Sequence, residues 1–169
     1  MAFSTSSASE EEYYMFGPYK VYHKEVFHTT QLTFAMVNLR PLLPGHVLIC
    51  PKRVVKRFVD LTSEEATDLW LTAHKVGGTL EDHYQASSLT FTIQDGPEAG
   101  QTVPHVHIHI LPRRAGDLMR RNGKHDRFYD AIDEKEKELK QGFDLDIVRK
   151  DRSWEERTQE AHVFRKLFP

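Results

Sequence analysis

The sequence predicts an α+β fold, in which helices pack mainly on one face of an antiparallel five-stranded sheet. Short runs of β-branched and aromatic residues are separated by turns marked with Gly and Pro, as in antiparallel sheets. One well-capped helix lies between these runs, and the other helical stretches follow the last of them. The crossover helices are too few for a parallel doubly wound sheet.

Length and composition predict a single folded domain. The chain has 169 residues, of which 39% are hydrophobic and 28% charged, as is typical of a globular protein with one core. We expect residues 1–12 to form a disordered tail, because they are rich in Ser and Glu and lack the basic and apolar segments of a targeting peptide. Residues 13–169 are expected to form the domain, with helices extending it at the C-terminus.

Charge, hydropathy and cysteine content narrow the expected partners and the expected compartment. The 23 basic and 25 acidic residues give a net charge of −2, so there is no excess of basic residues that would favour binding to nucleic acid. No run approaches the roughly 20 apolar residues of a membrane span, so no membrane partner is expected. The single cysteine, Cys50, cannot form an internal disulfide, which fits the reducing cytoplasm or nucleus.

Three strands are expected before the helix, over residues 19–27, 32–37 and 46–50. The first mixes aromatic, β-branched and polar residues in rough alternation, whereas the second is largely apolar, as a buried strand is. A turn containing Pro44 separates the second and third strands, and Pro51 ends the third.

A helix is expected over residues 62–84. Thr62 or Ser63 can cap its first turn by accepting a hydrogen bond from a free amide. Its apolar stripe recurs at spacings of three and four and consists of Leu69, Ala73, Val76 and Leu80. Gly77 and Gly78 weaken the helix, and a close approach to the sheet would explain both.

The remaining chain predicts two strands and two helices. The strands are expected over residues 89–93 and 105–111, joined by a Gly/Pro-marked loop over 94–102. The helices are expected over 126–142 and 153–167, the second capped by Ser153.

The segment HVHIHIL contains the candidate catalytic residues. His105, His107 and His109 alternate with aliphatic residues, so on a strand all three imidazoles project from one face and the aliphatic side chains pack on the core. Neighbouring imidazoles lie about 6.6–6.8 Å apart along the strand, which suits a polyanion laid over an open sheet surface.

Three interpretations of this segment compete. The row of histidines can be an exposed strand face without a function. It can belong to a zinc site, since zinc hydrolases use imidazoles two residues apart, although no carboxylate ligand adjoins the strand. It can also act at phosphorus, because a neutral imidazole is a nucleophile near neutral pH and can form a phosphoramidate.

The sequence resembles a known family. The pattern HVHIHIL is the signature of the histidine triad superfamily of nucleotide hydrolases and transferases. FAMVNLRPLLPGHVLICP and SLTFTIQDGPEAGQTVPHVHIHILPRRAGD are similar to its fragile histidine triad branch, over roughly Phe16 to Asp117. The resemblance implies hydrolysis of dinucleoside polyphosphates, preferentially diadenosine triphosphate to AMP and ADP, through an adenylyl-histidine intermediate. It also implies a homodimer with a joined sheet.

The resemblance assigns catalytic roles to four histidines. His107 is implied to be the nucleophile, and its flanking imidazoles, His105 and His109, can donate hydrogen bonds to the non-bridging phosphate oxygens. His46 matches the family's fourth histidine and is expected to orient His105, unless it is only a structural histidine at a strand start.

The resemblance also implies nucleotide-binding residues. Besides His109 they are Tyr19, Asn38, Gln94, Gly100, Gln101, Thr102 and Val103. Tyr19 departs from the family's usual histidine but can stack on adenine, and Asn38 can instead serve a turn. The glycine at 100 lets backbone amides approach an anion. Tyr129 is weakly similar to the family's phosphorylated loop tyrosine.

We expect an adenine nucleotide substrate and a divalent cation, Mg²⁺ or Mn²⁺, bound through the substrate polyphosphate, with no metal held by the protein itself. Two alternatives remain. One is hydrolysis or phosphorolysis of adenylylsulfate in the same site. The other is a nucleotide-binding signalling module with slow turnover.

Overall fold

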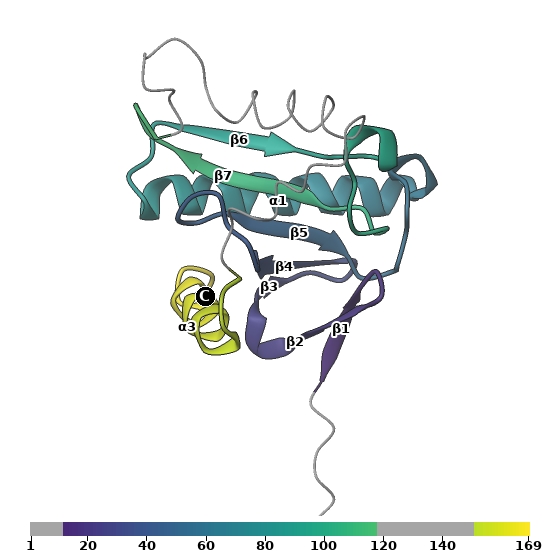
Figure 1. Ribbon diagram of the computed structural model, residues 1–169, viewed down its shortest axis with the longest axis horizontal. Helices are drawn as coiled ribbons and strands as arrows, with labels where there is room; N and C mark the ends of the chain where they lie inside the picture. The colour runs from purple at the N-terminus through teal and green to yellow at the C-terminus, as the bar shows by residue number, and fades with distance from the viewer. Residues whose placement is uncertain (1–11, 118–150) are drawn as a thin grey trace, which may run out of the picture.

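The computed structural model describes residues 12–117 and 151–169. Its main sheet is antiparallel and five-stranded, in the order β3-β4-β5-β7-β6, which confirms the predicted fold class (Figure 1). The strands and helices are β1 (Tyr13–Phe16), β2 (Tyr19–Tyr22), β3 (Val26–Thr29), β4 (Thr33–Val37), β5 (Val47–Pro51), α1 (Ser63–His83), β6 (Ser88–Thr92), β7 (Ile108–Arg113) and α3 (Trp154–Arg165). The predicted tail, except Glu12, and the predicted helix over 126–142 lie outside the described residues, as does Tyr129.

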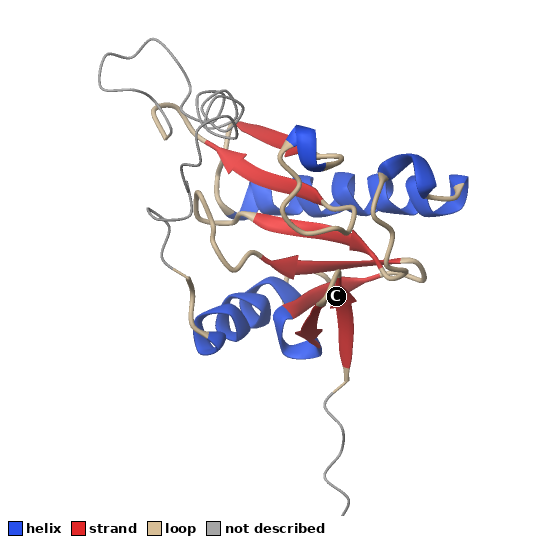
Figure 2. Cartoon of the chain, turned by 45° about the vertical axis from the view of Figure 1, so that its right-hand side comes forward, coloured by secondary structure: helices blue, strands red, loops and turns tan. Residues whose placement is uncertain are grey.

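Both helices pack on one face of the sheet. The core on this face joins Val47, Ile49, Val106, Ile108 and Ile110 of the sheet segments to Leu69, Ala73, Val76 and Leu80 of α1 and to Ala161 and Phe164 of α3. Helix α1 runs along the central strands and β6, whereas α3 adjoins β3, β4 and the 3-10 turn before β3 (Figure 2). Among the described residues, no helix is long and apolar enough to cross a bilayer.

A hairpin of β1 and β2 covers part of the opposite face. Gly17 turns the hairpin with a φ of +57°, a conformation that glycine adopts without strain. Phe16 and Val21 of the hairpin pack on Met36 and Leu48 of the sheet, in a second apolar cluster that also contains Cys50.

The predicted strand over residues 19–27 is wrong in its continuity. Strand β2 ends at Tyr22, a 3-10 turn follows over His23–Glu25, and β3 begins at Val26. The Glu25 carboxylate accepts a hydrogen bond of 3.2 Å from the Tyr22 backbone amide, which closes the turn. Alternation of side chains across the segment does not reveal this local contact.

The predicted helix starts are confirmed. Thr62 caps α1 and Ser153 caps α3, each within a capping box completed by a glutamate three residues later. A Cβ atom at Gly77 would lie 2.7 Å from the Phe91 ring, whereas at Gly78 it would meet nothing within 4 Å. The close approach to the sheet therefore explains Gly77 and not Gly78.

Candidate active site

The histidines and aliphatic residues of HVHIHIL divide between the two faces, as predicted. Val106, Ile108 and Ile110 lie in the core beneath the helices. The strand is shorter than predicted, because β7 begins only at Ile108 and the first two histidines lie in the irregular segment before it.

His105 is completely buried beneath the β1–β2 hairpin. Its Nδ1 accepts a hydrogen bond of 3.0 Å from the Gly17 amide, and its Nε2 donates over 2.9 Å to the Pro51 carbonyl. Burial lowers the pKa of His105 to about 4, so the ring is neutral at pH 7. The expectation that His105 donates to a phosphate oxygen is therefore corrected, because both ring nitrogens already bind the backbone.

His107 is neutral and held in one tautomer. Its Nδ1 lies 2.7 Å from the His105 carbonyl oxygen, and since a carbonyl can only accept, Nδ1 carries the proton. Burial lowers the pKa of His107, so Nε2 is unprotonated at neutral pH. The Phe16 ring packs edge-on against the imidazole at a centroid distance of 5.1 Å. The histidine row is thus held under a hairpin rather than on an open sheet surface.

His109 is oriented by a chain of polar side chains. The Leu42 amide donates to Nδ1 of His46 over 3.1 Å, so the proton of His46 is on Nε2 and is donated to Nδ1 of His109 over 3.0 Å. The proton of a neutral His109 is then on its Nε2 atom. Asn38 lies beside His46, and its Oδ1 atom accepts a hydrogen bond of 3.0 Å from the Arg40 amide. His46 therefore orients His109, and the expectation that it orients His105 is wrong.

A cavity of about 570 Å³ opens over His107 and His109. The predicted residues that line it are Tyr19, Asn38, Gln94, Thr102, Val103, His107 and His109. Its apolar floor consists of Phe16, Val21, Met36 and Leu48. Polar groups on the β7 side and an apolar floor toward β4 fit a ligand with a charged end and a flat apolar end.

Four predicted residues do not line the cavity. They are His105, His46, Gly100 and Gln101. Gly100 adopts the left-handed conformation, with a φ of +83°, at the end of the turn that leads to this loop. The Gln101 side chain accepts from the Gly96 amide over 3.2 Å and donates to the Lys56 carbonyl over 2.9 Å, which braces the loop from outside the cavity.

The sequence interpretation missed three cationic residues that line the cavity: Lys20, Arg40 and Arg157. Lys20 lies in the hairpin that the sequence did not predict. Arg157 comes from α3, far along the chain from the histidines, so no local pattern connects it with them. Within residues 12–117 and 151–169, no group of three or more His, Cys, Asp or Glu side chains is arranged to hold a metal ion.

Comparison with known proteins gives concordant results. The family model for the HIT domain matches residues 20–116. The chain is 64% identical to an Arabidopsis thaliana protein named bifunctional bis(5'-adenosyl)-triphosphatase/adenylylsulfatase FHIT, over 92% of this chain and 84% of that protein. It is 48% identical to the bis(5'-adenosyl)-triphosphatase of Dictyostelium discoideum, over 90% of this chain and 91% of that protein.

A solved structure shows the same architecture. The diadenosine triphosphate hydrolase of Plasmodium falciparum, crystallised with Cyclomarin A, aligns with a TM-score of 0.70 and 31% identity, over 97% of this chain and 88% of that one. The triad of alternating histidines, the five-stranded sheet and these matches agree. The chain belongs to the histidine triad (HIT) family.

Proposed function

We propose that this protein hydrolyses dinucleoside triphosphates, with diadenosine triphosphate giving AMP and ADP, through an adenylyl group carried on Nε2 of His107. The observation that carries the proposal is the hydrogen bond from Nδ1 of a buried, neutral His107 to the His105 carbonyl, which leaves Nε2 unprotonated in the lining of the cavity. The names of the Arabidopsis and Dictyostelium relatives support the same activity.

The reaction divides into two displacements at the α-phosphorus. The Nε2 lone pair attacks phosphorus, the bond from phosphorus to the bridging oxygen breaks, and ADP leaves with the electron pair of that bond. Water then attacks the same phosphorus, the bond to Nε2 breaks and AMP is released, with the proton of the water passing to solvent. The proton stays on Nδ1 throughout and remains hydrogen-bonded to the His105 carbonyl, which stabilises the positive ring of the intermediate.

Neighbouring donors supply the charge stabilisation. With the proton of His109 on Nε2, this imidazole donates to a non-bridging phosphate oxygen as negative charge develops. Gln94 and Thr102, which also line the cavity, are further donors for the polyphosphate. We expect Mg²⁺ or Mn²⁺ to enter as a complex with the polyphosphate, where it neutralises the leaving diphosphate.

Adenylylsulfate is a second proposed substrate. It presents the same α-phosphorus with a sulfate leaving group, so His107 can attack it without any other change in the site. The name of the Arabidopsis relative includes adenylylsulfatase, which favours this second activity.

Trapping the intermediate tests the proposal directly. Brief incubation with diadenosine triphosphate and neutral quenching should give an intact mass increased by one adenylyl group, mapped by peptide sequencing to His107. His107→Ala should abolish both the adduct and turnover while AMP binding by calorimetry is retained. His162→Ala, a change to an exposed histidine on α3, is the matched control. Full turnover by the His107→Ala variant would refute the assignment.

We further propose a homodimer built along the outer edge of β6, which pairs with no other strand within residues 12–117 and 151–169. This strand ends the main sheet, Phe91 on it is 38% exposed, and Trp70 of α1 is 44% exposed. An exposed strand edge flanked by aromatic rings is a surface that proteins usually cover. Cys50 is buried and unpaired, which suits the cytoplasm or nucleus as the compartment.

A further inference from the structure

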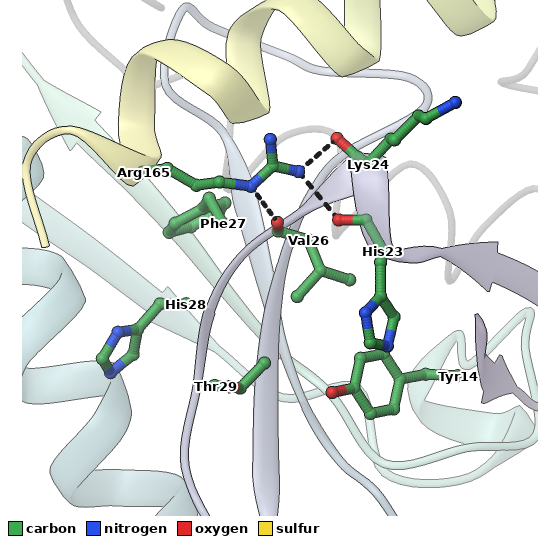
Figure 3. A pocket seen from close by; sticks show the side chains of 8 residues that line it. All are labelled: Tyr14, His23, Lys24, Val26, Phe27, His28, Thr29 and Arg165. Carbon is green, nitrogen blue, oxygen red and sulfur yellow. Dashed lines mark hydrogen bonds between the residues drawn. The ribbon is translucent and has the colours of Figure 1, made fainter. Parts of the chain in front are cut away.

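Helix α3 is fastened to the 3-10 turn that precedes β3. The Arg165 guanidinium donates hydrogen bonds to the backbone carbonyls of His23, Lys24 and Val26 over 2.6–2.9 Å (Figure 3). These bonds occupy one side of a second cavity of about 460 Å³, which is lined by Tyr14 of β1, by Phe27 and by other residues of β3. The C-terminal helix is therefore held in a fixed position against the sheet.

The same helix places Arg157 in the lining of the cavity over His107. Arg157, two turns before Arg165 on α3, forms an ion pair with Glu25, whose side chain is 2% exposed. Arg157 is itself 21% exposed and lines the cavity that contains His107. Its Nε atom is buried and has no hydrogen-bond partner among the described residues. Glu25 thus fixes the guanidinium without satisfying all of its donors.

The strand register places Arg157 at the end of the cavity opposite the histidines. His109 of β7 pairs with Leu48 of β5, Leu48 pairs with Met36 of β4, and Met36 pairs with Val26 of β3. Adjacent strands lie about 4.8 Å apart, so β3 is roughly 14 Å from β7. Glu25 directly precedes Val26, so its partner Arg157 lies near the β3 end.

This geometry separates the two ends of a bound nucleotide. A phosphorus atom at His107 directs the rest of the nucleotide over the apolar surface of Leu48 and Met36, where a flat base can pack. The edge of that base then faces the β3 end. Arginine has only donors, and a purine carries acceptor atoms on its edges.

We propose that Arg157, anchored by Glu25, donates a hydrogen bond to an acceptor on the edge of the purine base and is a specificity-determining residue for purine nucleotides. The inference rests on the proposed function, because the attack of His107 on the α-phosphorus sets the direction in which the nucleotide extends. A pyrimidine is smaller, so its edge stops short of the guanidinium and gains little from it.

Steady-state kinetics with diadenosine triphosphate and diuridine triphosphate test the proposal. Arg157→Met should raise KM for the adenine substrate about tenfold or more, with kcat within about twofold, because a charge-assisted hydrogen bond in the bound state is lost. The kcat/KM for the uridine substrate should change by about twofold or less, so that purine selectivity falls. Arg157→Lys, which retains a cation beside Glu25, should give an intermediate KM.

Two further variants guard against a merely structural effect. Arg157→Met leaves the Glu25 carboxylate buried without its partner, which is destabilising. Glu25→Gln combined with Arg157→Met removes that stranded charge, and it should recover thermal stability while purine selectivity stays low. Arg152 forms an ion pair with Glu160 of α3 but does not line the cavity. Arg152→Met should therefore leave purine selectivity unchanged.

Failure of the Arg157–base contact and failure of the proposed hydrolysis give different results. If the wild-type protein turns over neither dinucleotide, the proposed function fails. If turnover depends on His107 but Arg157→Met leaves both KM values unchanged, or raises them equally, then Arg157 does not contact the base and this inference alone is overturned.

Discussion

Two neutral imidazoles buried side by side couple the stability of this protein to pH. His105 titrates at about 4 in the folded state, below its ordinary value of 6.5, and burial also lowers the pKa of His107. Below pH 6.5 the unfolded chain therefore binds protons on these rings, whereas folded His105 stays neutral until the pH approaches 4. The stabilisation is complete above pH 6.5 and is lost as pH falls toward 4.

We predict that the free energy of unfolding falls by about 2 kcal/mol between pH 7 and pH 5 through His105 alone. Urea denaturation at the two pH values measures this. His105→Gln removes the titrating group, so the same pH change should cost this variant about 2 kcal/mol less than it costs the wild type. An equal loss in both proteins would show that His105 is not the source.

The chain from Leu42 through His46 to His109 sets the donor that faces the phosphate. We predict that His46→Ala lowers kcat about a hundredfold with a smaller change in KM, because a catalytic group displaced by about 1 Å loses that much. His162→Ala should retain the wild-type kcat in the same assay. Equal kcat values for His46→Ala and the wild type would mean that His109 holds its position without this contact.

Sequence alone identified the row of three histidines but not its environment. Alternation in HVHIHIL correctly placed the aliphatic side chains in the core and the imidazoles on the other face. It did not show that a hairpin covers that face, because the contact between Gly17 and His105 joins residues 88 positions apart. The position of Arg157 in the cavity could not be predicted for the same reason, since only folding brings α3 beside β3.

The secondary-structure elements differ in how clearly the sequence marks their ends. Helix starts at Thr62 and Ser153 were predictable, because a capping box is contained in four consecutive residues. The interruption of the 19–27 strand was not predicted, although the contact between the Glu25 carboxylate and the Tyr22 amide is equally local, because Tyr22 is not a residue type that usually marks a helix start. The Gly17-Pro18 pair between two aromatic segments was the available sign of the β1–β2 hairpin.

The two adjacent glycines of α1, Gly77 and Gly78, give a matched test of how this helix packs on the sheet. We predict that Gly78→Ala stabilises the protein by about 0.5–1 kcal/mol, because alanine favours the helix and the added Cβ meets nothing within 4 Å. Gly77→Ala should lower stability instead, since its Cβ would lie 2.7 Å from the Phe91 ring. Chemical denaturation of the two variants compares them, and equal shifts would contradict the packing of α1 on β6.

At the scale of the whole molecule, the edge of β6, which pairs with no further strand among the described residues, predicts self-association. Sedimentation equilibrium should give twice the chain mass of 19.7 kDa, and Trp70→Glu should shift the protein toward the monomer. Val59→Glu changes an apolar side chain that is 76% exposed and lies outside both β6 and α1, and it should leave the dimer intact. A wild-type monomer at micromolar concentration, or loss of the dimer in both variants, would contradict the assignment of this edge.

The hydrogen bond from His107 to the backbone carbonyl also dictates regiochemistry. With one ring nitrogen engaged before any ligand arrives, only the tele position can carry phosphorus, and the pros isomer is inaccessible to the folded chain. Nuclear magnetic resonance of protein labelled with nitrogen-15 in its imidazoles should therefore report a single phosphorylated isomer, set by the backbone rather than by the intrinsic reactivity of the ring.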